Sequence, residues 1–301
     1  MIGANCVLVK LSPEISLKTA FVRGYFVKKL VANVKQVLRA NGLSGIETVK
    51  GGGRLYVFAK KGQDLEKVAV LLSGVFGVQA VALCRRVSSQ NVSEIRSSAL
   101  QVALDCLGGV KSFAVRLKNS GEKKVSSQKF EADLGSQILS KMPGLKVDLK
   151  NPEKKISVEI GPKGSFVFAE EIPGFSGLPL GVEGNVAIFF EGKKEELLAA
   201  FLVMKRGCNI FPVLARDSAE LKAHVNKLVA RNSFRQFKFS LESDLLGLVA
   251  APDIAVKALV RSDESFSKNL AVQKENCPVP VFWPLVFFPK DLEKNHQEAL
   301  N

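Results

Sequence analysis

The sequence predicts a protein of mixed α/β and α+β class, built from three successive units. Up to residue 172, strand and helix patterns are interrupted by Gly- and Ser-rich breaks, and after residue 173 strands alternate regularly with helices. The chain has 301 residues, of which 47% are hydrophobic, and a mean hydropathy of +0.13. This length and this apolar content are sufficient for several packed domains.

The first unit, residues 1–87, follows the order strand, helix, strand, strand, helix, strand. The long helical pattern of this unit ends at Asn41-Gly42, a pair that typically terminates a helix. Three glycines at 51–53 indicate a hairpin, and Asp64 can cap the second helix. The expected elements are strands at 6–11, 45–50, 54–59 and 79–87, and helices at 20–40 and 65–72. This order is typical of a ferredoxin-like domain.

The second unit, residues 88–172, begins at a polar break. The segment 88–91 can cap a helix, and Gly108-Gly109 can end it. The expected elements are helices at 92–107 and 127–140, and strands at 112–117, 146–149, 155–160 and 165–170. We therefore expect a second compact unit of strands and helices.

The third unit, residues 173–301, follows a Gly/Pro-rich bridge at 173–179. The expected elements are strands at 185–190 and 208–214, and helices at 194–206 and 219–231. This alternation favours a parallel, doubly wound sheet.

The positive charge of the chain is concentrated in its first part. Lys and Arg total 43 and Asp and Glu total 29, which gives +14 and a pI near 9.6. Residues 1–180 carry +13 of this excess and residues 181–301 carry +1. Polyanions are therefore the favoured partners, with nucleic acid first among them, although general solubility would also account for a high pI.

Several classes of site and location are disfavoured. The five cysteines are odd in number and widely spaced, so we expect neither a disulfide framework nor a CxxC metal site, and a reducing compartment. His224 and His296 form no metal-binding pair, and we interpret both as surface histidines. The apolar run at 279–288 is broken by prolines. We expect a cytoplasmic protein without a membrane segment or a bound metal.

A basic cluster around the start of the helix at 127–140 can contact phosphates. Its members are Arg116, Lys118, Lys123, Lys124 and Lys129. A solvated, charged loop is the alternative interpretation.

The loop after the strand at 185–190 occupies the position where α/β nucleotide-binding domains hold phosphates. It consists of Glu191, Gly192, Lys193, Lys194, Glu195 and Glu196. Three glutamates would add negative charge beside a phosphate, which two lysines offset only in part. We favour a charged helix N-terminus over an ATP site.

Three local motifs resemble tRNA 4-thiouridine synthases of the ThiI type. Glu14-Ile15-Ser16-Leu17-Lys18 followed by Arg23 is similar to the opening motif of that family, and the bridge at 174–181 is similar to its Gly-x-Gly-Gly-Leu-Pro-x-Gly, with Ser176 in place of a glycine. Residues 112–116, 147–149 and 156–160 resemble a THUMP domain. The resemblance implies a THUMP domain at 88–172 that recognises tRNA through its acceptor end, and it adds Lys18 and Arg23 to the candidate RNA contacts.

The resemblance also implies a third domain, at 173–301, derived from the PP-loop (adenine nucleotide alpha hydrolase-like) fold but shortened. Where the family has Ser-Gly-Gly-x-Asp-Ser, only Gly192 is retained. The family's Ser-Gln-Thr motif is missing near 264–267, and 225–260 is too short for the extra helix that bears a catalytic cysteine. We therefore expect no catalytic residue and no cofactor. ATP and Mg would be bound only if the loop is a divergent but active one.

The sequence thus predicts a tRNA-binding THUMP protein that acts as a catalytically inactive adaptor or subunit for a tRNA-modifying enzyme. Residues 1–180 of this chain are expected to bind the tRNA. The alternatives are an active ATP-dependent tRNA sulfurtransferase that forms 4-thiouridine, and a globular protein whose RNA role has lapsed. The sequence leaves open whether the protein forms a homodimer.

Overall fold

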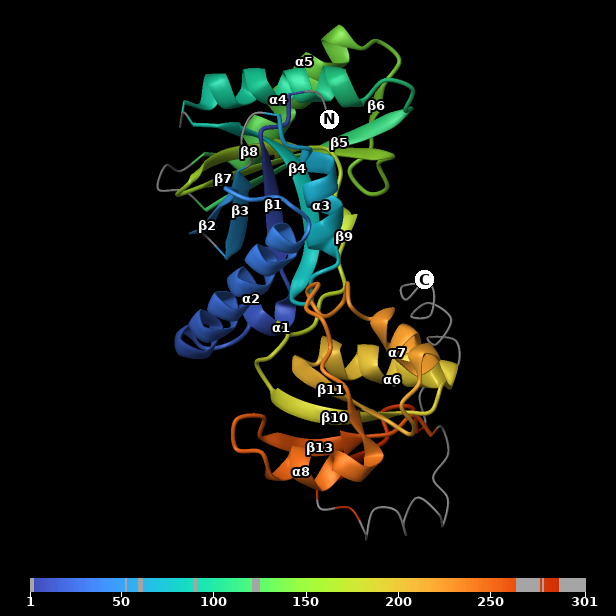
Figure 1. Ribbon diagram of the computed structural model, residues 1–301. Coiled ribbons are helices and arrows are strands. Elements are labelled where there is room, and N and C mark those ends of the chain that lie inside the picture. Colours follow the sequence, from blue (N-terminus) through green and yellow to red (C-terminus); the bar gives the residue numbers. More distant parts are fainter. Residues whose placement is uncertain are drawn as a thin grey trace. The chain divides into compact units, whose positions relative to one another are not determined.

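The computed structural model describes residues 3–51, 53–58, 62–88, 91–120, 125–263, 277 and 279–286, and Figure 1 shows its elements. Packing divides the chain into two compact units. Unit 1 comprises Met1–Leu11, Asn41–Ser73 and Val78–Gly174, and unit 2 comprises Ser12–Ala40, Gly74–Gly77 and Phe175–Asn301. The domain boundaries expected at 87/88 and 172/173 stay predictions.

Unit 1 is built on a nine-stranded sheet of order β2-β3-β1-β4-β8-β7-β5-β6, with β9 paired to β4. The strands are β1 (Cys6–Leu11), β2 (Glu47–Gly51), β3 (Arg54–Phe58), β4 (Val78–Val87), β5 (Ser112–Asn119), β6 (Lys146–Val147), β7 (Lys154–Gly161), β8 (Gly164–Phe168) and β9 (Ile172–Pro173). The long β4 joins the ferredoxin-like and the following strands, because residues 78–84 pair with β1 while residues 85–87 pair with β8.

Helices α3 (Leu65–Ser73), α4 (Val92–Cys106) and α5 (Ser127–Lys141) complete unit 1. As predicted, the Asp64 carboxylate accepts hydrogen bonds from the first turn of α3, and Asn91 caps α4. The apolar side of β5 is buried together with residues of α4 and α5. Successive residues of a strand point to opposite faces, so Arg116 and Lys118 lie on the other face.

Unit 2 contains a five-stranded sheet of order β12-β11-β10-β13-β14, in which every pair is parallel. The strands are β10 (Gly184–Phe190), β11 (Cys208–Leu214), β12 (Ser240–Leu241), β13 (Val256–Val260) and β14 (Val281–Phe282). Helices α6 (Lys194–Lys205) and α7 (Ala219–Asn226) pack on one face and α8 (Leu245–Ala250) on the other (Figure 1), with the short 3-10 helix Glu242–Asp244 before α8. The predicted parallel, doubly wound arrangement is confirmed.

Helices α1 (Pro13–Ser16) and α2 (Ala20–Ala40) also belong to unit 2. The fully buried Asn33 of α2 donates to the Leu180 carbonyl at 3.1 Å and accepts from Arg235 Nη2 at 3.1 Å. Ser12 Oγ donates to the Gly177 carbonyl at 2.6 Å. The helix expected in the first unit is therefore tied to the bridge and to the last part of the chain.

The bridge requires left-handed backbone at two successive residues. Gly177 has φ +76°, and a Cβ there would lie 2.3 Å from the Lys205 carbonyl oxygen, so only glycine fits. Ser176 has φ +55° at the position where the resemblance expects a glycine. A residue with a Cβ pays roughly 1–2 kcal/mol for this conformation.

Within the part of the chain that the structure describes, no helix combines the length and the apolar character that crossing a bilayer requires.

Candidate nucleotide-site loop and nucleic-acid interface

The loop between β10 and α6 holds a carboxylate of its own chain. Glu196, in the first turn of α6, is only 1% exposed. Its Oε1 accepts a hydrogen bond from the Glu191 backbone N–H at 2.8 Å, and its Oε2 accepts from the Gly192 N–H at 3.0 Å. The N–H groups at this strand-to-helix turn are those that bind an anion in phosphate loops. Here they donate to an internal carboxylate.

The environment of Glu196 combines burial with several donors. Burial raises the pKa of the Glu196 carboxyl, and the N–H groups of Glu191, Gly192 and Lys193, together with His224, oppose this shift without cancelling it. The carboxylate is thus held in a dry site by directed hydrogen bonds.

His224 of α7 lies against the same loop. Its Nε2 is 3.0 Å from the Lys193 carbonyl oxygen and 3.8 Å from Glu196 Oε2. A carbonyl oxygen only accepts, so Nε2 carries the hydrogen in this contact. The side chain is 15% exposed. His224, which we interpret from the sequence as a surface histidine, is thus only partly exposed, and helix α7 brings it against the loop. No spacing in the sequence indicates this contact.

The remaining charged residues of the loop face outward. The Lys193 ammonium pairs with Glu191 at 2.5 Å, which raises the pKa of Lys193. Lys194 is exposed and Glu195 is half-buried. The three glutamates are therefore not equivalent, because only Glu196 enters the loop. An ATP phosphate does not fit the loop as it stands, since Glu196 already occupies its donors.

Metal ligands do not gather anywhere in the described ranges: no group of three or more His, Cys, Asp or Glu side chains there is placed to hold an ion.

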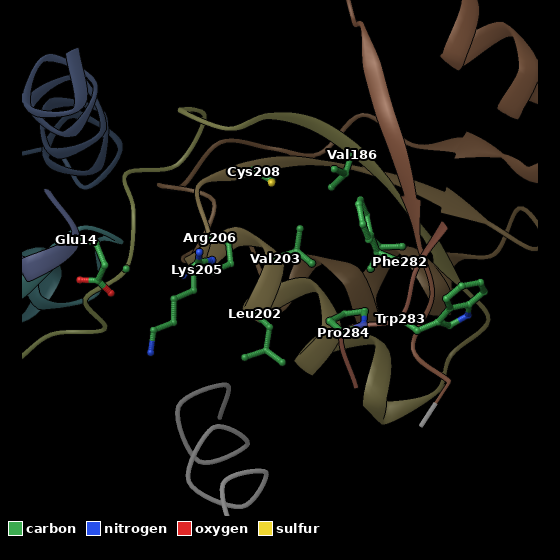
Figure 2. A pocket seen from close by; sticks show the side chains of 12 residues that line it. Glu14, Val186, Leu202, Val203, Lys205, Arg206, Cys208, Phe282, Trp283 and Pro284 are labelled. Atoms are coloured by element: carbon green, nitrogen blue, oxygen red, sulfur yellow. The ribbon is translucent and has the colours of Figure 1, made fainter. Parts of the chain in front are cut away.

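A cavity of about 670 Å³ lies beside α6, and Figure 2 shows the side chains around it. Its lining is mainly apolar, with Leu202 and Val203 from α6 and Phe282 from β14. Cys208, at the start of β11, also lines it, and burial raises the pKa of this thiol. A thiol whose protonated form is favoured is a poor nucleophile, so the site offers no evident covalent chemistry.

The candidate RNA-binding residues of unit 1 divide into two kinds. Arg116 is engaged by main-chain oxygens, because Nη1 donates to the Val115 carbonyl at 3.0 Å and Nη2 to the Leu149 carbonyl at 2.5 Å. Lys118 on β5 and Lys129 on α5 are exposed. Arg116 therefore supports the local structure, while the two lysines are accessible to a phosphate.

Lys18 and Arg23 lie in unit 2 and are both exposed. Arg23 Nη1 donates to the Ser16 carbonyl at 3.3 Å, which links the start of α2 to α1. Lys123 and Lys124 lie outside the described residues. The assignment of all seven residues to RNA contact stays a prediction.

Two family models match the chain. The ThiI ferredoxin-like domain matches residues 6–82, and the THUMP domain matches residues 89–170. A probable tRNA sulfurtransferase of Methanobrevibacter smithii is 35% identical over 71% of this chain and 55% of its own length. The chain spans about half the length of the curated relatives it matches.

Solved structures extend the likeness over the whole chain. The crystal structure of a protein from Pyrococcus horikoshii is 26% identical, with a TM-score of 0.82 over 98% of this chain and 99% of that one. A 4-thiouridine synthetase, solved as an RNA complex with bound ATP, has the same fold, with a TM-score of 0.80 and 20% identity over 99% of this chain and 85% of that one. The matched domains, the opening motif and the bridge agree on one assignment. The chain belongs to the ThiI family.

Proposed function

We propose that this protein binds tRNA and serves as a catalytically inactive adaptor or subunit in tRNA modification, without ATP-dependent thiolation of its own. The observation that carries the second half of this proposal is the Glu196 carboxylate in the loop after β10. The first half is supported by the THUMP domain, by relatives named tRNA sulfurtransferases, and by the charge of the chain.

Electrostatics supports binding of a polyanion by the first part of the chain. Residues 1–180 carry +13, and Lys118, Lys129 and Lys18 are exposed cations among them. Each phosphate contact releases condensed counterions, so affinity for RNA falls with a log–log salt slope of about 0.7–0.9 per contact.

Electrostatics also opposes binding of ATP at the loop. A phosphate that replaced the Glu196 carboxylate would have to break its two hydrogen bonds and lie beside a displaced carboxylate. Two like charges about 4 Å apart repel by about 4 kcal/mol at an effective dielectric constant near 20. The serine hydroxyls of the family motif are absent as well.

The test uses the full chain. The sequence predicts that residues 1–180 suffice for tRNA binding, but Asn33 of α2 accepts from Arg235, so truncation at residue 180 would remove a partner of a buried side chain. Gel shifts with unmodified tRNA at two salt concentrations measure RNA binding. Calorimetry with Mg-ATP, and a thiolation assay with a persulfide donor, measure the inherited reaction.

We expect salt-sensitive tRNA binding, no ATP binding at micromolar concentration and no 4-thiouridine. ATP-dependent thiolation would instead establish an active sulfurtransferase with a divergent loop, and micromolar ATP binding alone would contradict the interpretation of the loop as unable to hold ATP. Absence of tRNA binding at low salt, in a folded sample, would overturn the RNA-binding half. Copurification with tRNA and with a tRNA-modifying enzyme is the expected signature of an adaptor, and sedimentation reports whether it is a homodimer.

A further inference from the structure

Helix α2 has one face that is exposed along its whole length. At 100° per residue, positions 21, 25, 28, 32, 35 and 39 fall within about 40° of one line along the helix. All six are exposed, whereas the opposite side is buried. We call this the outer face of α2; its side chains are Phe21, Tyr25, Lys28, Ala32, Lys35 and Arg39.

The outer face begins with two aromatic rings that are unusually accessible. Phe21 is 88% exposed and Tyr25 is 50% exposed. They are four residues apart, so their side chains are neighbours one turn apart on the helix. Large apolar side chains so exposed indicate a surface that meets a partner.

Beyond the rings, every charged side chain of the outer face is a cation. Lys28, Lys35 and Arg39 follow the rings, and the whole of α2 contains no Asp or Glu. At about 1.5 Å per residue, the face from Phe21 to Arg39 extends over about 27 Å. A row of cations without acids complements a partner with continuous negative charge.

We infer that the outer face of α2 is a track for single-stranded RNA, in which bases stack on Phe21 and Tyr25 and phosphates contact Lys28, Lys35 and Arg39. Aromatic platforms combined with basic side chains are how proteins hold unpaired nucleotides, because every base has a face that stacks and every linkage has a charge. A duplex keeps its bases stacked on one another, so only an unpaired segment can use the rings.

A protein partner fits this face less well. Stable protein interfaces bury about 800 Å² on each side and have few charges at their centre, whereas here two rings are followed by cations. A membrane is also disfavoured, because the apolar side of α2, with Phe26, Leu30 and Val34, is buried in the protein.

The inference rests on the proposed RNA-binding function, and its test separates the two. The probes are a fluorescent RNA hairpin with a single-stranded 3′ extension and the same hairpin trimmed flush, bound to the full chain. The variants are Phe21→Ala with Tyr25→Ala, the conservative pair Phe21→Trp with Tyr25→Phe, and the control Leu246→Ala, which alters a residue of α8 that is 67% exposed.

Removing both rings is expected to weaken binding of the extended hairpin by about five- to 150-fold for each stacked base that is lost, while the flush hairpin is bound as before. The conservative pair and Leu246→Ala should retain wild-type affinity for both probes. Equal losses on both hairpins, or no loss on either, would overturn the inference. So would an unchanged RNA affinity accompanied by a changed oligomeric state, which would make the face a protein interface.

A second set of variants tests the cations. Lys28→Ala, Lys35→Ala and Arg39→Ala together should lower the salt slope for the extended hairpin, compared with the matched set Lys227→Ala, Lys238→Ala and Lys257→Ala, which removes the same charge from exposed positions elsewhere in unit 2. If the salt dependence of RNA affinity were the same in the two sets of variants, the proposed phosphate contacts of Lys28, Lys35 and Arg39 would be contradicted. If the wild-type chain bound neither hairpin nor tRNA, the proposed function itself would fail. If the wild type binds RNA and removal of the two rings does not change its affinity, the stacking inference alone is overturned.

Discussion

Glu196 Oε2 lies 3.0 Å from the backbone nitrogen of Gly192, so the one glycine retained from the family's phosphate loop donates to a carboxylate of the same chain. The adjacent N–H, of Glu191, donates to the other carboxylate oxygen. A loop that keeps its backbone donors satisfied in this way is stable without a phosphate.

The first prediction concerns the stability that this carboxylate supplies. Glu196→Ala leaves two backbone donors without their acceptor, and each unsatisfied buried group costs about 1–3 kcal/mol. We expect the free energy of unfolding, measured in urea, to fall by about 2–6 kcal/mol. Inorganic pyrophosphate should then raise the melting temperature of Glu196→Ala and leave that of the wild type unchanged.

The matched control is Glu195→Ala, which changes the neighbouring, half-buried glutamate. It should alter stability by no more than about 0.5 kcal/mol. Equal effects of the two substitutions would show that Glu196 has no special role in the loop.

The second prediction concerns pH. Burial raises the pKa of Glu196 in the folded protein above the ordinary value of 4.5 that applies when the chain is unfolded. The folded state therefore binds the proton more tightly, and the stability this provides is present below the ordinary pKa and is lost as pH rises through the raised one. Wild type should lose stability relative to Glu196→Gln as the pH rises above about 4.5.

Urea unfolding of both proteins at several pH values between acid and neutral measures this difference. Titrating groups that do not interact with Glu196 cancel in the comparison, and the pair Glu196–His224 is compared as a unit. A difference that stays constant with pH, or that grows in favour of the wild type, would contradict the raised pKa.

The third prediction separates Arg116 from its basic neighbours. Arg116→Ala removes hydrogen bonds to the carbonyls of Val115 and Leu149 and should cost about 1–3 kcal/mol of stability. Lys118→Ala with Lys129→Ala should change stability by less than about 0.5 kcal/mol for each residue, because both side chains are exposed.

In gel shifts with tRNA, the double lysine variant should lose more affinity than Arg116→Ala, which is the reverse of their order in stability. The double lysine variant is expected to bind more weakly and to lower the salt slope by about 1.4–1.8. An unchanged slope in a folded sample would mean that the RNA footprint lies on other residues.

The fourth prediction concerns the bridge. Ser176→Gly relieves a left-handed backbone at φ +55° and should raise the free energy of unfolding by about 0.5–1 kcal/mol. Gly177→Ala should lower it by more than that, because the new Cβ would lie 2.3 Å from the Lys205 carbonyl. Thermal unfolding of both variants is the measurement, and a destabilised Ser176→Gly would show that the serine side chain contributes more than its strain costs.

Much of the fold could be predicted from local patterns. The apolar spacing of residues 20–40 coincides with α2, the caps at Asp64 and Asn91 are confirmed, and the regular alternation after residue 173 predicted the parallel sheet. The helix expected over 219–231 was too long: α7 ends at Asn226, since the backbone bonds that follow close short turns instead. These features depend on residues that are close in sequence, and for this reason they can be predicted from the sequence.

The sequence by itself determined the fold class, the family motifs and the charge imbalance, because composition and spacing record which residues must be buried and where the chain must turn. Only the tertiary structure decided which of the three glutamates enters the loop, that His224 lies over it, that Arg116 is held by carbonyls, and that α2 packs with unit 2. Each of these depends on a partner brought near by folding: Asn33 meets Arg235 across more than two hundred positions of sequence. The direction of a side chain follows from the packing around it, and no local pattern encodes that packing.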